Sequence, residues 1–578
     1  MDTQFRKRLD NMFVWNKLSS FLNFFKLSFL GLFPSLKDPI HQIRKNWAQP
    51  RSRLRNFERI ALFHHLKSKG SILALDSIDD QTWSDLNLEE LFSLIDHCDT
   101  PIGSQLLYHR LRTINQIDPQ KLQQDFSRYS GIQASVDSRE SIQKILMPIM
   151  GEAGFSVSHL LFSPLPNRPK FFPLFYLLSA LSIASMICLA FYAQALFVLI
   201  PAWLINIAIS GRFSRSINEY SQAFGYLHRL TSIGLNLAST KINLKSPQIT
   251  RLAEIAPKIS ALRSKINFFK SDKFDKWKAN EIAFLFAEYF NLFCLVETIH
   301  FFRSVRYVEI NIQILHELFD SVASLDCDIA IASYISGSKY CCLPTLADKK
   351  DIDVVGIYHP LIANAVPNDF AIKNKSAIFI GSNMSGKTTF MRTFGINMIL
   401  FRSFGICHAL AACLPDLQVK TSINRADDLI NSASYFRREA DHIMSFFVAT
   451  SGAMLYIIDE IFKGTNHIER VGAATAVLEN LAQANLVFVT THDVEIVHRL
   501  ERGYLPFSFK ETVADAGTSY DYLIHEGVLV NHNALRILRN MNYPSEILTS
   551  AERIVSEQRE RLKRSDPAPI KFHRWSKS

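Results

Sequence analysis

The sequence is short of several features that define whole classes of protein. Its eight cysteines form no C-x-x-C pair, and the Cys341-Cys342 doublet lacks the spacing of a metal site. Residues 1–20 have no apolar core followed by small side chains, and no solenoid-length repeat or low-complexity tract is present. We therefore expect reduced thiols and no cleavable signal peptide. The apolar content of 48% also excludes a disordered chain.

Charge is missing altogether from one long stretch, residues 171–211. A membrane-spanning helix needs about 20 apolar residues, so this stretch predicts two spans, 172–190 and 194–210, joined by a tight turn near 192–194. Basic residues flank it on both sides: Arg168, Lys170, Arg212 and Arg215. Flanks of this sign predict a hairpin with both ends in the cytoplasm. The alternative is a buried helical pair inside a soluble cytoplasmic protein.

Length and net charge leave the partners open. At 578 residues the chain is too long for one hydrophobic core, and about three or four domains are expected. Lys and Arg number 64 against 54 Asp and Glu, and the resulting charge of +10 suits either nucleic-acid phosphates or an anionic membrane surface.

Three stretches allow more than one interpretation. Residues 13–33, rich in Phe and Leu, either lie on a membrane surface or pack against the rest of the protein. A basic run follows, comprising Arg44, Lys45, Arg51, Arg53 and Arg55, and we interpret it as a solvated linker face. A second basic patch comprises Lys265, Lys270, Lys273, Lys276 and Lys278, interleaved with Phe268, Phe269, Phe274 and Trp277. That patch suits either nucleic-acid contact or a solvated helix face.

The most informative stretch is residues 378–389, an apolar run followed by a G-x-x-x-x-G-K-S/T loop and then helical periodicity. Backbone N–H groups of such a loop and the N-terminus of the following helix converge on phosphate oxygens. Lys387 is expected to reach the β- and γ-phosphates, and the Thr388 hydroxyl to bind Mg²⁺. The predicted nucleotide-binding residues are Gly381, Ser382, Asn383, Met384, Ser385, Gly386, Lys387, Thr388 and Thr389. The alternative is a plain glycine-serine turn before a helix.

Two further apolar runs end in residues suited to hydrolysis. Residues 455–458 are followed by Asp459, expected to hold Mg²⁺, and by Glu460, expected to polarise the attacking water as a general base. A second run, 486–491, ends at His492. Because ligands lie at the carboxyl ends of parallel strands, His492 is predicted to sense the γ-phosphate. Strands alternating with helices from about Asp351 predict an α/β domain for these motifs.

With these motifs the chain resembles the MutS-type mismatch-repair ATPases, a branch of the ABC-type P-loop ATPases. The family loop G-P-N-M-G/S-G-K-S/T is present with Ser382 in place of the proline, and D-E-x-x-x-G-T is present at 459–465. Other matching positions are His359-Pro360, Asp427-Asp428-Leu429, Ser434, Phe436, Glu439, Thr491-His492 and, near where the family stacks a residue on adenine, Tyr522. Residues 85–107 and 325–330 are similar to the family's core or lever domain.

The resemblance implies a homodimer with composite ATP sites, in which Ser434 completes the pocket of the opposite subunit. It implies ATP and Mg²⁺ as ligands, and DNA as a partner. Two departures alter the last point. Roughly 70 residues precede the core, fewer than the family's mismatch-reading and connector domains require. The family's mismatch-probing motif is F-x-E, and the two occurrences here, at 286–288 and 509–511, do not lie in its place. The apolar hairpin also interrupts the core where the DNA clamp would be inserted, so recognition by the usual wedge is not expected.

We therefore predict an α/β P-loop ATPase domain of ABC type joined to an all-α core or lever domain that a two-helix transmembrane hairpin interrupts. The predicted divisions are 1–60 (amphipathic and basic segment), 61–165 (core, first part), 166–212 (hairpin), 213–345 (core, second part), 346–545 (ATPase) and 546–578 (helix and basic tail). The predicted function is a membrane-anchored, DNA-binding MutS-like ATPase with its ATPase domain in the cytoplasm. The alternatives are a tethered ATPase switch that acts on a protein or lipid partner, and a transporter subunit.

Overall fold

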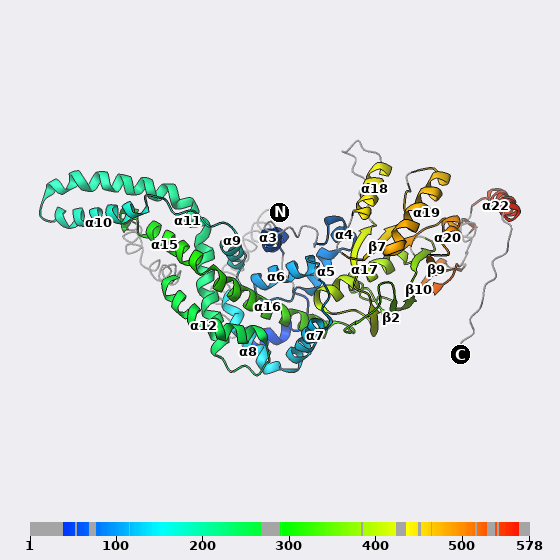
Figure 1. Ribbon diagram of the computed structural model, residues 1–578, viewed down its shortest axis with the longest axis horizontal. Helices are drawn as coiled ribbons and strands as arrows, with labels where there is room; N and C mark the ends of the chain where they lie inside the picture. The colour runs from blue at the N-terminus through cyan, green and yellow to red at the C-terminus, as the bar shows by residue number, and fades with distance from the viewer. Residues whose placement is uncertain are drawn as a thin grey trace, which may run out of the picture.

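The computed structural model describes residues 39–51, 55–68, 77–114, 116–266, 289–290, 292–382, 385–423, 435–448, 452–463, 465–514, 517–528, 538–539 and 543–565. It is elongated, with a helical lobe at one end and an α/β lobe at the other (Figure 1). The stretch 13–33 and the basic patch after Lys265 lie outside the described residues.

The helical lobe is built from segments on both sides of the apolar hairpin. Its helices are α2 (Pro39–Asn46), α3 (Phe57–Ser68), α4 (Asp80–Asp85), α5 (Leu88–Ile95), α6 (Pro101–Arg112), α7 (Pro119–Ala134), α8 (Val136–Leu146), α9 (Phe155–Phe162), α12 (Pro247–Ile266), α15 (Val296–Ile310) and α16 (Ile312–Gly337). Helix α6 begins after Thr100, as the Thr-Pro pair predicts, and the buried Asp326 of α16 accepts hydrogen bonds from the backbone N–H groups of Asp99 (2.9 Å) and Thr100 (2.8 Å). The two similar stretches of the core therefore meet directly.

The basic run near the N-terminus is not the solvated face that we expected. Arg44 makes two contacts of 2.7 and 2.9 Å with Glu140, Arg51 lies 2.6 Å from Asp99, and Arg55 lies 3.3 Å from Asp96. The Asp96 side chain is fully buried, and a buried carboxylate is stable only when it is paired and hydrogen-bonded. The interpretation as a solvated face is wrong for Arg51 and Arg55, which are largely buried against carboxylates of the core, whereas Arg44 stays 62% exposed while it pairs with Glu140.

The uncharged stretch forms a helical hairpin, α10 (Phe172–Leu189) and α11 (Leu196–Ser239), joined by a short turn that includes η4 (Ala193–Ala195). Among the described residues, α10 and α11 are long and apolar enough to cross a membrane, and most residues of their apolar stretches are exposed. The second helix does not end near residue 210 as predicted. It is 44 residues long in all and runs on to Ser239 in the core, because the apolar stripe from Tyr220 to Leu237 is buried there.

The α/β lobe contains two mixed sheets. The larger has the order β10 (Gly517–Glu526), β9 (Tyr504–Ala514), β4 (Ser376–Ile380), β8 (Leu486–Thr490), β7 (Met454–Asp459), β6 (Gln418–Ser422), and only the β9–β10 pair is antiparallel. The smaller has the order β1 (Thr345–Leu346), β5 (Ala411–Leu414), β2 (Ile352–Ile357), β3 (Asn368–Ile372). Helices of this lobe are α17 (Lys387–Phe404), α18 (Tyr435–Met444), α19 (His467–Ala484), α20 (Val494–Arg499) and α22 (Ser545–Ser565). The carboxyl ends of β4, β7 and β8 therefore share one edge.

A buried carboxylate of α4 joins the two lobes. Asp85 accepts hydrogen bonds from the Thr421 hydroxyl (2.7 Å) and from the backbone N–H of Ile423 (2.8 Å), at the end of strand β6. The Thr82 hydroxyl accepts a third bond from the Thr421 N–H at 3.1 Å. The helical lobe is thus hydrogen-bonded to the strand next to β7.

Replacing that carboxylate is expected to destabilise the protein. Asp85→Ala removes the acceptor of one buried and one partly buried donor, and a buried donor left without a partner costs about 1–3 kcal/mol. We expect a clear fall in the thermal unfolding midpoint of the full chain, measured by differential scanning calorimetry. Glu89→Ala, an exposed substitution on the adjacent helix α5, is the control and is expected to change the midpoint little. Equal midpoints for the two variants would contradict the role given to Asp85.

Candidate nucleotide site

The glycine-rich loop follows strand β4 and leads directly into helix α17. Gly381 and Gly386 have φ values of 153° and 106°, a backbone region that side-chain-bearing residues rarely adopt. Ser385 is fully buried, and its hydroxyl donates to the Ser382 carbonyl at 2.8 Å, which closes the loop on itself. The loop residues Asn383 and Met384 lie outside the described residues. Thr389 is exposed in the first turn of the helix.

Lys387 is the first residue of α17, and its ammonium group folds over the loop. Nζ donates to the carbonyl oxygens of Gly381 and Ser382, each at 2.7 Å. The side chain is 5% exposed, and this burial lowers the pKa of Lys387 from its ordinary value. Two neutral carbonyl oxygens therefore hold the ammonium group over the loop, and oxygen atoms of an anion bound in the loop can replace them.

Oxygen atoms gather where strands β7 and β8 end. The Thr388 hydroxyl donates to Asp459 at 3.1 Å, and the Thr490 hydroxyl donates to the other oxygen of the same carboxylate. The Thr490 oxygen also accepts the backbone N–H of Glu460 at 3.1 Å. A hydroxyl and a carboxylate side by side are hard oxygen ligands of the kind that Mg²⁺ prefers, so Thr388 and Asp459 fit such an ion.

Glu460 is in contact with two basic side chains. Its carboxylate oxygens lie 3.1 Å from His492 Nε2 and 3.1 Å from Lys463 Nζ. The hydrogen bond from His492 and the neighbouring Lys463 lower the pKa of Glu460 to about 2, although partial burial opposes them. Glu460 also has a positive φ of 52°, so the chain turns sharply after β7 and aims the carboxylate at His492. The sequence motif did not indicate the contact with Lys463.

Removing Lys463 should change the pH dependence of any reaction that uses the Glu460 carboxylate. The pKa of that group is depressed, so its favourable pairing is present above the unfolded pKa and is lost as pH falls towards about 2. In Lys463→Gln the ammonium partner of Glu460 is gone, and the pKa of Glu460 rises. We expect the acid limb of the rate profile of such a reaction to move up by roughly one pH unit. Lys463→Arg keeps the charge and is the control; an unshifted limb in Lys463→Gln would contradict the pairing.

Helix α18 is tied to the turn that follows Glu460. The buried Glu439 accepts the backbone N–H of Phe462, and the ring of Phe436 lies 5.7 Å from the Phe462 ring. Phe462 has a φ of 59°, a conformation that a bulky residue adopts only when its surroundings hold it. A movement of α18 is therefore transmitted to the turn that carries Glu460. Ser434 and residues 427–429 lie outside the described residues.

A bidentate ion pair positions the turn after β8. Arg470 of α19 lies 3.0 and 3.1 Å from the two carboxylate oxygens of Asp493, and His467 lies 3.4 Å from the same group. Asp493 directly follows His492, so this pair fixes the backbone beside the histidine. The pattern Thr491-His492-Asp493 was visible in the sequence, but its partner on α19 was not.

Tyr522 lies beside the loop in space. A Cβ on Gly386 would be 3.3 Å from its Cδ1 atom, and the side chain is 46% exposed. Its backbone carbonyl accepts from the Asn368 amide at 3.1 Å, within the irregular part of the β9–β10 ribbon. The half-exposed ring can therefore stack on a flat group bound next to the loop.

The His-Pro pair is a further position that the family resemblance singled out. His359 of the His-Pro pair is buried, and burial lowers its pKa to about 4, so the ring is neutral at pH 7. Across the described residues, no group of three or more His, Cys, Asp or Glu side chains is arranged to hold a metal ion. Mg²⁺ would therefore need oxygen atoms of the bound phosphates in addition to Thr388 and Asp459.

Comparison with known proteins finds that the region around this site is similar to a family. Residues 377–559 match the family described as MutS domain V. The DNA mismatch repair protein MutS of Fusobacterium nucleatum is 23% identical over 362 residues, which are 59% of this chain and 37% of that protein. The DNA mismatch repair protein msh3 of Emericella nidulans is 28% identical over 273 residues, 44% of this chain and 25% of that protein. MutS of Lactobacillus helveticus is 31% identical over 176 residues, 29% and 20% of the two chains. The similarity thus spans little more than a third of these relatives, or less.

Proposed function

On the premise that this chain is a member of the MutS-type family through its domain V, we propose that it binds and hydrolyses ATP as a membrane-tethered dimer. The observation that carries the proposal is the convergence of Lys387, Thr388 and Asp459 with Glu460 and His492 at the carboxyl edge of one sheet. Three separate segments of the chain supply these side chains, and each has the chemistry that phosphoryl transfer to water requires.

The side chains divide the work by their charge and place. Lys387 exchanges its two carbonyl partners for β- and γ-phosphate oxygens, while the N-terminus of α17 faces the same anion. Thr388 and Asp459 would hold Mg²⁺, which when bound would neutralise phosphate charge. Glu460 is ionised at neutral pH and orients a water molecule for attack, accepting its proton. His492, hydrogen-bonded to Glu460, holds that carboxylate in position and contacts the γ-phosphate.

A second copy of the chain is proposed to close over this site. Large apolar side chains are exposed on α18 (Phe436 and Met444), just after it (Phe447 and Val448) and at the start of α19 (Ile468). Figure 1 shows α18 and α19 on the same side of the lobe. Ile468 is 84% exposed, although it follows the Asp-Glu turn by only eight residues. An apolar group of this size next to a catalytic turn is typical of an interface. Contact there would move α18, and with it the turn held by Glu439 and Phe462.

The exposed hairpin is proposed to insert in a membrane. Helix α10 is about 27 Å long at 1.5 Å per residue, and the uncharged first part of α11, residues 196–211, is about 24 Å long. Both lengths are close to the roughly 30 Å of a hydrocarbon core. Membrane fractionation of the full chain tests this, beside a variant in which a short glycine linker replaces residues 171–211. The rings of Phe175 and Phe213 lie 6.1 Å apart, so the ends to be joined are close. We expect the full chain with the membranes and the variant in the soluble fraction; equal partition would refute the tether.

DNA is the proposed substrate of the switch because the relatives are named as DNA mismatch repair proteins. Affinity for branched and linear duplexes, measured against salt concentration, tests it, since each phosphate that the protein neutralises adds about one to the steepness of the logarithmic salt dependence. Neutralising the patch from Lys265 to Lys278 should reduce that slope. A second candidate, a switch that acts on a lipid or protein partner, is favoured by the hairpin's position within the core. A slope near zero for every DNA would support this second candidate.

A further inference from the structure

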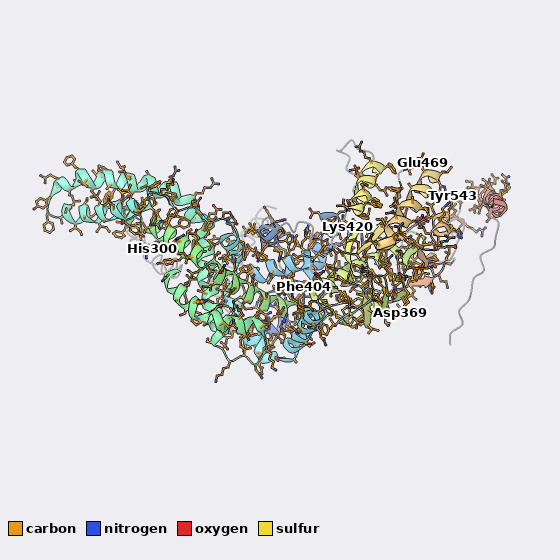
Figure 2. All side chains as sticks on the ribbon, viewed as in Figure 1. His300, Asp369, Phe404, Lys420, Glu469 and Tyr543 are labelled. Atoms are coloured by element: carbon orange, nitrogen blue, oxygen red, sulfur yellow. The ribbon has the colours of Figure 1, made fainter. Side chains whose placement is uncertain are left out.

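The base of the hairpin is built from three segments that are distant in the sequence. Phe172 of α10 lies 5.9 Å from Phe302 of α15, Phe213 of α11 lies 5.1 Å from Phe302, and Phe175 lies 6.1 Å from Phe213. These four rings form one cluster, which we call the base cluster. It fixes α15 against both helices of the hairpin, and α15, with the labelled His300, lies beside the hairpin's base (Figure 2).

Basic side chains surround the base cluster on all three segments. They are Arg168 and Lys170 before α10, Arg212 and Arg215 on α11, and Arg303 on α15, and we call them the basic collar. The Arg168 guanidinium lies 3.9 Å from the centre of the Phe172 ring, and Arg303 directly follows Phe302. All five side chains are exposed. Arg303 is far from the hairpin's flanks in the sequence, so folding and not sequence proximity places it here.

The collar keeps its positive charge. Within the part of the chain that the structure describes, none of the five takes part in an ion pair, although Glu219 lies one turn beyond Arg215 on α11. By contrast, Arg306, one turn beyond Arg303, is paired with Glu309 at 2.8 Å. Five exposed cations without acidic partners form a strong local anion-binding surface.

The collar lies at one end of the uncharged zone. Above it, α10 runs for about 27 Å without a charged residue, and the turn at the far end exposes Phe191, Tyr192 and Phe197. Aromatic side chains at one end and basic side chains at the other are typical of the two interfaces of a membrane. Within the uncharged part of α11, the Trp203 ring stacks on Phe293 at 4.0 Å, and Asn206 donates to the Phe293 carbonyl at 2.5 Å. Phe293, in the segment before α15, therefore also contacts the uncharged part of the hairpin.

We propose that the basic collar binds the headgroups of anionic phospholipids at the cytoplasmic surface of the membrane. The inference rests on the proposed membrane tether and adds the class of lipid that the tether selects. The phosphate groups meet Arg168, Lys170, Arg212, Arg215 and Arg303, while the acyl chains lie along the exposed apolar side chains of α10 and α11. The base cluster holds together the three segments that carry the five cations, so all five lie at the same end of the hairpin and act on the same leaflet.

The test compares lipids around the full chain reconstituted in phosphatidylcholine vesicles. Spin-labelled phosphatidylglycerol and phosphatidylcholine report, by electron spin resonance, which lipid is preferred next to the protein. One basic side chain near a surface changes affinity roughly fivefold, so we expect a preference for the anionic lipid of at least about that size. It should fall to near one in the variant Arg168→Gln, Lys170→Gln, Arg212→Gln, Arg215→Gln, Arg303→Gln. The matched control changes five exposed arginines elsewhere to glutamine: Arg251, Arg499, Arg502, Arg539 and Arg553.

A single substitution tests whether lipid preference comes from the collar as folded, with Arg303, or from the basic residues that flank the hairpin in the sequence. Arg303→Gln should lower the preference severalfold, whereas Arg306→Gln on the same helix should not. A lipid preference that is unchanged in the variant with all five substitutions would overturn the lipid assignment. So would a preference that inorganic phosphate abolishes when chloride at the same concentration does not. Flotation with neutral vesicles tests the tether by itself. A chain that floats only with anionic vesicles, and no longer floats when the five collar residues are replaced, would refute the spanning hairpin and support the collar.

Discussion

Lys387→Ala is expected to lower the affinity for ATP at least about 100-fold. The ammonium group makes two bonds of 2.7 Å to loop carbonyls, and two charge-assisted bonds to phosphate oxygens, at about 1.5–3 kcal/mol each, would replace them. An alanine offers neither bond nor charge. Equilibrium binding of a fluorescent ATP analogue to the full chain, titrated with Mg²⁺ present, measures the change in affinity.

A lysine at the opposite end of strand β4 provides the control for this experiment. Lys375 is partly exposed, and its Nζ donates to the Glu501 carbonyl at 3.2 Å, away from the loop. Lys375→Ala should therefore bind the analogue as the unmodified chain does. Equal affinity in Lys387→Ala and the unmodified chain would remove the assignment of the loop to nucleotide binding. The unfolding midpoints of both variants show whether weaker binding reflects the site or the fold.

Glu460→Gln is expected to reduce ATP turnover by about 10²–10⁴-fold while leaving ATP affinity within a factor of about three. Glutamine keeps the shape of the side chain and an acceptor for His492, but it cannot take a proton from water. ATP then persists in the site, and a dimer closed by ATP should accumulate. Single-turnover hydrolysis and light scattering on a sizing column measure the two effects.

Glu495→Gln is the matched control for that change, because this exposed glutamate pairs with Arg499 on α20, at 2.7 Å, outside the site. It should hydrolyse ATP at the normal rate. Turnover by Glu460→Gln at the normal rate would show that another group prepares the water. Loss of ATP binding in the same variant would instead show that Glu460 supports the fold of the loop.

The sequence could predict the edge at which the site forms, because the motifs lie at the ends of apolar runs. Parallel strands bring such ends together, and Asp459, Glu460 and His492 indeed lie around Thr388 in space. The roles given to these residues stay predictions. Contacts made across the fold had no sequence signal: Lys463 on Glu460, Arg470 on Asp493, and Glu439 on the turn at Phe462.

The helical lobe shows the same division between local and distant interactions. The start of α6 at Thr100-Pro101 follows from capping chemistry within four residues, so the local sequence is enough to predict it. The pairing of Arg51 and Arg55 with carboxylates could not be, since a basic run has the same sequence whether it is solvated or faces a buried acid. The continuation of α11 beyond residue 210 was missed because the composition changes there from apolar to amphipathic while the helix does not end.

The rate of ATP hydrolysis per subunit, measured in detergent over a wide range of protein concentrations, tests most directly the claim that a second copy completes the site. Light scattering on the same samples gives the fraction of dimer against a subunit mass of 65.9 kDa. The account predicts a rate that rises with the dimer fraction and is close to zero for the monomer. A dilute monomer that hydrolyses ATP at the full rate per subunit would contradict it.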